Sequence, residues 1–147
     1  MKADLRYTLA DVFETLQLPE LTEDLRTLGK ELDAVRAEVM LRRRTGLTAT
    51  YNLVFDPACQ DDDIVSLRRL HRAIDAATCL AYGWADLVLD HGFHRAGTYV
   101  RYTVGPAAQR EIVDRLLELN GVRARSARNG RGAAREAPPR KPRPVRR

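Results

Sequence analysis

Two histidines and three adjacent aspartates are the residues of this chain whose types and spacing most readily suggest metal chemistry. His91 and His94, with Asp90 beside them, could supply ligands to a cation, but no third ligand with the spacing of a zinc site follows. The three aspartates at 61–63 could hold a cation weakly. Acids in this pattern are more typical of a solvated helix start, where they interact favourably with the helix dipole. We therefore expect no metal ion, and hydrogen-bonded loop histidines at 91 and 94.

Nucleophilic chemistry has no stronger support. His71 lies among arginines and is predicted to lie on the solvated face of a helix. Cys59 lies in a polar loop, while Cys79 lies in an apolar helical stretch where a small buried side chain is expected. A disulfide framework or a zinc site would use more cysteines, closely paired. No Ser-His-Asp or Cys-His arrangement can be proposed from spacing.

Several aromatic residues could stack on nucleic-acid bases, namely Trp84, Tyr82, Tyr99 and Tyr102. Such residues more often lie in or beside the core, and that is the interpretation we favour.

Motifs for cofactor chemistry are missing from the sequence. Methyl transfer from S-adenosylmethionine would need a Gly-rich turn after a strand, and an adenine-specific enzyme would add an Asp/Asn-Pro-Pro-aromatic site. Neither is present, and the one Pro-Pro pair is flanked by Ala137 and Arg140. The chain is therefore predicted to be no enzyme on its own and to hold no cofactor.

The positive charge is concentrated at the C-terminal end. The chain has a net charge of +5, but residues 123–147 hold ten Lys/Arg and one acid, Glu136, which is +9 and leaves −4 for residues 1–122. An electrostatic attraction to nucleic acid therefore belongs mainly to the tail, where Arg140, Lys141 and Arg143 are candidates for phosphate contact. GC-rich DNA read out of frame also encodes such Arg/Ala/Gly/Pro tails, so an accidental extension is an equal alternative.

Apolar periodicity predicts three helices. The first begins at Leu21, is capped by Thr22 and stops at Gly46; the second follows residues 61–63 and ends at Gly83; the third covers 106–119. Each has an apolar face with spacings of three and four: Leu21, Leu25, Leu28, Leu32, Val35 and Val39; Ile64, Leu67, Leu70, Ile74, Ala77 and Ala81; Ile112, Val113, Leu116, Leu117 and Leu119.

The remaining segments are predicted as short strands, packed connections and a tail. Residues 5–8 and 98–104 alternate with the period of a strand, and residues 47–55 form a packed connection between two antiparallel helices. Residues 123–147 cannot bury enough apolar surface to order themselves. We expect a mainly α fold: a small helical domain at 21–122 with long amphipathic helices, a minor strand component and a disordered basic tail at 123–147.

Five segments in order resemble the C-terminal part of MmeI-like type IIG/IIL restriction-modification DNA methyltransferases. They are Leu5-Arg-Tyr-Thr8 with 11–15 and Pro19; 40–48 with Tyr51-Asn52 and Asp56-Pro57; 67–71 with Asp75 and 81–84; His91-Gly-Phe-His94 with 101–103; and 115–120. The resemblance covers residues 5–120. The sequence departs from the family at 16–18, where Leu-Gln-Leu replaces Phe-Pro-Phe, and after Asn120.

The resemblance implies a remnant of the target-recognition domain at 1–20 followed by the family's C-terminal helical domain. The chain would be a truncated or split piece of an adenine-specific DNA methyltransferase, possessing none of the parent's catalytic residues or S-adenosylmethionine site. Its partners would be DNA and a methyltransferase subunit, docked on exposed apolar surface of the helix from Leu21. Candidates for phosphate contact in the folded part are Arg42, Arg43, Arg44, Arg68, Arg69 and Arg72.

Two other function classes stay open. A stand-alone helical nucleic-acid-binding protein would act through the basic tail. A small independent enzyme would need a pocket that the sequence does not show. The first 20 residues lack the apolar run of a signal peptide, and no segment approaches the roughly 18 apolar residues of a membrane span, so a soluble cytoplasmic protein without a membrane partner is expected.

Overall fold

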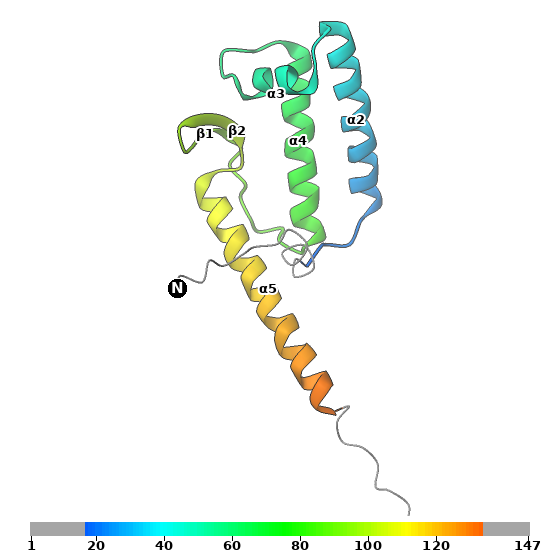
Figure 1. Cartoon of the computed structure of the whole chain (residues 1–147), viewed down its shortest axis with the longest axis vertical. Coiled ribbons are helices and arrows are strands. Elements are labelled where there is room, and N and C mark those ends of the chain that lie inside the picture. Colours follow the sequence, from blue (N-terminus) through cyan, green and yellow to red (C-terminus); the bar gives the residue numbers. More distant parts are fainter. Residues whose placement is uncertain (1–16, 134–147) are drawn as a thin grey trace, which may run out of the picture. The chain divides into compact units, whose positions relative to one another are not determined.

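The computed structural model describes residues 17–133, and this part of the chain is mainly helical, as expected (Figure 1). Its elements are α2 (Glu23–Arg43), α3 (Leu47–Phe55), α4 (Asp62–Ala81), β1 (Gly92–Ala96), β2 (Tyr99–Thr103) and α5 (Pro106–Ala133). The predicted strand at 5–8, most of the remnant predicted at 1–20, and the candidates Arg140, Lys141 and Arg143 lie outside the described residues.

The described residues belong to two compact units. Leu18–Val113 form one of them, and α5 from Asp114 onwards belongs to the other. Among the helices of residues 17–133, none combines the length and the apolar character that crossing a bilayer requires.

Helix α2 starts where the sequence predicts it but stops by another device. The hydroxyl of Thr22 accepts a hydrogen bond from the backbone N–H of Leu25 at 3.3 Å, which caps the first turn. At the other end Arg44 adopts a left-handed conformation with φ 52°, and its N–H donates to the carbonyl of Leu41. The predicted stop, Gly46, is instead the residue that precedes α3.

Residues 47–55 form a helix, α3, where the sequence predicted only a packed connection. Their Thr, Tyr, Val and Phe residues favour strands, but burial against neighbouring helices overrides that preference. Thr50 is fully buried, and its Oγ1 donates to the carbonyl of Gly46 at 3.1 Å and bonds Oγ1 of Thr45 at 3.0 Å. These bonds fix the turn between α2 and α3.

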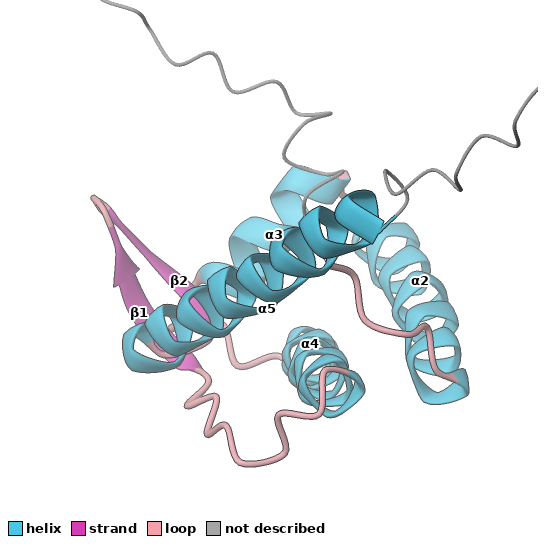
Figure 2. Cartoon of the chain, turned by 90° about the horizontal axis from the view of Figure 1, so that it is seen from below, coloured by secondary structure: helices cyan, strands magenta, loops and turns pink. Residues whose placement is uncertain are grey.

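Helices α2 and α4 form the predicted antiparallel pair, with α3 across one end (Figures 1 and 2). The core of this unit is a cluster of four buried residues, Val39, Val54, Ile64 and Leu67, supplied by all three helices. Ile64 and Leu67 have no exposed surface, so truncating either to Ala is expected to cost about 2–5 kcal/mol. The apolar faces predicted for the first two helices are therefore largely confirmed, although Leu21 is 57% exposed.

Helix α4 ends as predicted at Gly83, whose φ of 78° allows the N–H of Trp84 to reach the carbonyl of Cys79 at 2.8 Å. Cys79 is buried, as expected. A hairpin follows in which β1 and β2 pair antiparallel, from Gly92 opposite Thr103 to Ala96 opposite Tyr99. The predicted strand at 98–104 is confirmed, but the predicted loop at 91–94 is wrong, because residues 92–94 belong to β1.

Helix α5 runs further than predicted, to Ala133, so a tail beginning at 123 is wrong for residues 123–133. Apolar periodicity does stop near Asn120, but Arg and Ala are strong helix formers and basic residues suit a helix C-terminus. The predicted buried face also differs, since Val113 and Leu117 are 53% and 63% exposed. The more covered residues follow a spacing of three and four: Ala108, Ile112, Leu116 and Leu119.

Candidate functional site

Of the arginines predicted to contact DNA, Arg68 has the position that departs most from the prediction. It is 5% exposed and donates to four backbone carbonyl oxygens at 2.8–3.0 Å: those of Leu53, Val54, Asp56 and Cys59. The carbonyls at the end of a helix have no partner within that helix. Arg68 of α4 therefore closes the C-terminal end of α3 and the loop behind it.

The same guanidinium also lies against the hairpin. Its central carbon is 5.0 Å from the centre of the Phe93 ring and 5.7 Å from that of Tyr102. A buried cation with its donors satisfied and two aromatic rings around it is available to no phosphate. The prediction that Arg68 contacts DNA is wrong, because the side chain is part of the interior.

Arg42 and Arg43 are neutralised within the protein by the acidic start of α4. Arg43 donates to Oδ2 of Asp63 at 2.7 Å and to Oδ2 of Asp61 at 2.6 Å, and Arg42 reaches Asp63 at 2.6 Å. The side chain of Asp63 is 10% exposed, and the hydrogen bond from Arg43 holds its pKa well below the ordinary value. The run at 61–63 does begin a helix, as predicted, but Asp61 and Asp63 form ion pairs with α2, while Asp62 is exposed.

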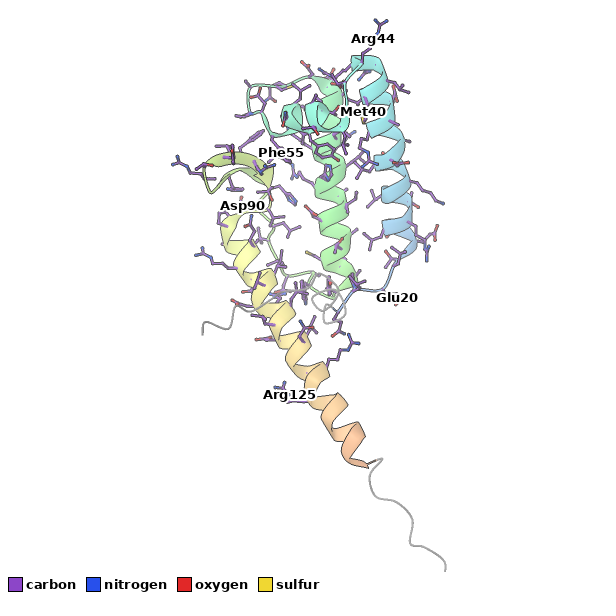
Figure 3. The ribbon with its side chains drawn as sticks, in the orientation of Figure 1. Glu20, Met40, Arg44, Phe55, Asp90 and Arg125 are labelled. Carbon is purple, nitrogen blue, oxygen red and sulfur yellow. The ribbon has the colours of Figure 1, made fainter. Side chains whose placement is uncertain are left out.

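Three of the six predicted arginines of the folded part remain exposed and form none of the ion pairs found in the described residues: Arg44, Arg69 and Arg72. Arg69 and Arg72 lie one turn apart on α4 and are both exposed, whereas Ile64 and Leu67 of the same helix are buried. Arg44 points away from the end of α2 (Figure 3). Arg69 also borders a groove of about 590 Å³ between α2 and α4, together with Arg42 and Arg43.

The end of α5 is the most basic part of the described residues. From Leu119 to Ala133 the sequence has four arginines and no acid: Arg123, Arg125, Arg128 and Arg131. The sequence-based charge count placed this excess in an unstructured tail, whereas part of it belongs to a helix. A basic helix can neutralise a row of phosphates without reading sequence.

A cavity of about 260 Å³ in the unit Leu18–Val113 is lined by His71 and His91, which the sequence did not predict to lie together. Nε2 of His71 lies 2.9 Å from the hydroxyl oxygen of Tyr51. Burial lowers the pKa of His71, although the nearby carboxylate of Asp75 acts in the opposite direction. The predicted solvated position of His71 is therefore wrong.

His91 lines the same cavity. Its side chain is 7% exposed, and Nε2 lies 2.8 Å from Oδ2 of Asp75. His94 instead bonds the carbonyl of Asp90 at 2.9 Å. Both histidines are hydrogen-bonded, as predicted, and residues 17–133 hold no group of three or more His, Cys, Asp or Glu side chains suited to a metal ion.

The aromatic residues divide between the interior and the surface. Tyr82 and Trp84 stack at 4.5 Å between ring centres, and burial raises the pKa of Tyr82. Tyr102 packs edge-on against Phe93 at 5.2 Å, whereas Tyr99 is 68% exposed. The prediction that these are core or near-core residues therefore fails at Tyr99.

Exposed apolar surface on α2 lies at its C-terminal end rather than along the whole helix. Leu41 is 79% exposed and Leu47, at the start of α3, is 51% exposed. With Met40 they line a shallow groove that Arg36 and Arg44 border. This groove is the exposed apolar surface that the C-terminal end of α2 offers for docking.

Comparisons of the chain with protein-family models, with curated proteins and with solved structures found no match. Function is therefore inferred from the geometry of the described residues and from the resemblance between sequence segments.

Proposed function

We propose that this chain is the C-terminal piece of a site-specific adenine DNA methyltransferase of a restriction-modification system, and that it assists DNA binding without catalysing a reaction itself. The observation that carries the DNA-binding part is the distribution of arginines. Arg44, Arg69 and Arg72 are exposed, and the sequence at the end of α5 adds four more without an intervening acid. Guanidinium groups free of carboxylates can neutralise phosphates and release their counterions.

The methyltransferase part of the proposal comes from the resemblance of the five ordered segments. Several of their residues have structural roles here: Arg68 closes α3, His71 bonds Tyr51, and Asp75 bonds His91. A set of residues that holds one helical unit together is what a shared domain would retain.

Phosphate contact is tested by fluorescence anisotropy on a 30-base-pair duplex at several salt concentrations. In the variant Arg44→Gln/Arg69→Gln/Arg72→Gln we expect weaker binding. The slope of log K against log salt should also become shallower, by about one for each phosphate that is no longer neutralised. The matched control is Arg26→Gln/Lys30→Gln/Arg95→Gln, which removes the same charge from exposed positions outside the proposal. Equal weakening in both variants would reduce the effect to net charge and contradict the proposed contacts.

The partner is tested by reading the coding DNA immediately upstream of Met1. A Gly-rich cofactor turn and an Asn-Pro-Pro-Tyr site there would supply the methyltransferase portion, and the two pieces should then co-purify and methylate adenine together. Methylation or cleavage of DNA by the pure chain would overturn the non-catalytic role.

A stand-alone nucleic-acid-binding protein is the second candidate, favoured by the basic end of α5. In that case deletion of 123–147 abolishes DNA binding and its salt dependence, and no methyltransferase partner is needed. A methyltransferase piece instead keeps its partner after the same deletion. The two candidates therefore differ in what the shortened chain still binds.

A further inference from the structure

The cavity beside His71 has a composition that the proposed phosphate contacts do not use. It is built by Tyr51 and Phe55 of α3, His71 and Asp75 of α4, His91, and Arg101 of β2. Phe55 lies where α3 faces the hairpin (Figure 3). All of these residues belong to the unit Leu18–Val113, so the cavity is complete within it.

Aromatic rings form much of the cavity wall. Tyr51 and Phe55 lie with ring centres 6.1 Å apart, and the imidazole of His71 meets Tyr51 edge-on at 5.6 Å. On the hairpin side, His91 stacks with Tyr102 at 6.5 Å. Walls of this kind favour a flat aromatic ligand, because ring faces attract one another and exclude water.

Two polar groups at the cavity complement each other. The guanidinium of Arg101 lies 4.8 Å from the centre of the Phe55 ring. Arg101 is exposed, and none of the ion pairs found in the described residues joins it to a carboxylate. Asp75 uses Oδ2 for His91, and its side chain is 45% exposed, which leaves acceptor capacity open. The cavity thus offers the donors of a guanidinium and an acceptor of a carboxylate.

We infer that this cavity binds a purine base, and that guanine is the best match. Guanine presents two adjacent N–H donors, which a carboxylate accepts, and two acceptors, O6 and N7, which a guanidinium contacts as a pair. A lone phosphate would face the carboxylate of Asp75, so an anion site is the weaker interpretation. About 260 Å³ is below the roughly 300–1,000 Å³ of sites for drug-sized ligands, and suits a single base.

Free nucleotides test the purine site directly, by calorimetry and by backbone amide shifts with the full chain. Guanosine 5′-monophosphate should bind, and ribose 5-phosphate, which lacks the base, should not. Inosine 5′-monophosphate, which lacks the amino group facing Asp75, should bind about tenfold more weakly. Equal binding of all three compounds, or no binding of the guanine nucleotide, would overturn the inference.

Variants connect the binding to the named groups. Arg101→Gln should weaken the guanine nucleotide about tenfold, while Arg95→Gln, on the other strand of the same hairpin and outside the cavity, should leave it unchanged. Asp75→Asn should weaken the guanine nucleotide more than the inosine nucleotide, because inosine presents only its ring N–H to this side chain. Because Asp75→Asn also breaks the bond to His91, thermal unfolding is measured alongside, and Arg101→Gln decides the question if Asp75→Asn does not fold.

The base could come from a free nucleotide or from an unstacked position in DNA, and the second source rests on the proposed function. A duplex with one unpaired guanine, compared with the same duplex carrying an abasic residue there, separates the two. If the chain prefers the duplex with the unpaired guanine, and Arg101→Gln removes that preference, the site binds a base of DNA. Nucleotide binding without that preference assigns the site to a free purine. Nucleotide binding by a chain that binds no duplex at all would end the proposed function and keep the purine site.

Discussion

The guanidinium carbon of Arg68 lies 5.0 Å from the centre of the Phe93 ring, so one α4 side chain joins the end of α3 to the hairpin. Its nitrogen atoms meanwhile bond four backbone carbonyls. An ammonium group could not satisfy these acceptors, because they are spread around a flat fork of donors. The position is therefore specific for arginine rather than for positive charge.

The first prediction follows from this geometry. Arg68→Lys should lower the free energy of unfolding by about 2–4 kcal/mol, because several buried carbonyls no longer have donors. Urea unfolding followed by circular dichroism measures the change. Arg69→Lys, at the exposed neighbouring position, is the control and should stay within about 0.5 kcal/mol of the parent. Similar values for the two variants would show that Arg68 does not close α3.

Arg44 gives a second prediction that separates backbone conformation from charge. Its φ of 52° disfavours any residue with a Cβ, so Arg44→Gly should raise the free energy of unfolding by about 1 kcal/mol. Arg44→Ala keeps the strain and should leave stability within about 0.5 kcal/mol of the parent. Both variants remove the same charge and should weaken binding to a DNA duplex equally. Stability measurements and anisotropy titrations on the pair check both statements, and a difference in DNA affinity would argue against a role for the charge.

The periodic parts of the fold could be predicted from the sequence, and the aperiodic parts could not. Helices α2 and α4 have apolar residues at spacings of three and four, and β2 lies within the segment 98–104 that was predicted as a strand. Helix α3 was missed because nine residues rich in Thr, Tyr, Val and Phe carry no helical signal without their neighbours. β1 was missed because Gly92–Ala96 has no apolar alternation, so only pairing with β2 makes it a strand.

The inward positions of Arg68, His71 and Asp75 on α4 could have been predicted from the spacing of the helix, although the cavity itself could not. His71 and Asp75 follow Leu67 at intervals of four, and Arg68 follows Ile64 at the same interval, so all three continue buried rows of the helix. The sequence-based prediction placed Arg68 and His71 on the solvated face because they lie in an arginine-rich segment, in which Arg69 and Arg72 do face outward. The contribution of Tyr51, His91 and Arg101 comes from other elements and depends on tertiary structure alone.

The third prediction concerns acid stability. The carboxylate of Asp63 has a lowered pKa in the folded protein and an ordinary one, about 3.9, in the unfolded chain. It therefore contributes stability above about pH 4, and that contribution is lost as the pH falls further. Asp63→Asn should cost about 2 kcal/mol at pH 7, a difference that shrinks below pH 4, as urea unfolding across pH 2–7 would show. Asp62→Asn, exposed in the same turn, should produce no such pH-dependent difference.

The fourth prediction concerns His71, whose burial makes the folded protein prefer the neutral imidazole. The unfolded chain has an ordinary histidine pKa of about 6.5, so below that pH it binds more protons at this position than the folded protein does. The free energy of unfolding should therefore fall as the pH drops below about 6.5, and level off once the folded protein is protonated too. In His71→Gln this part of the fall between pH 7 and 5 should disappear, whereas His94→Gln, whose imidazole bonds a backbone carbonyl outside the cavity, should retain it. Urea unfolding at pH 7 and pH 5 distinguishes the two, and an unchanged slope in His71→Gln would mean that the pKa of this imidazole is the same in the folded and the unfolded protein.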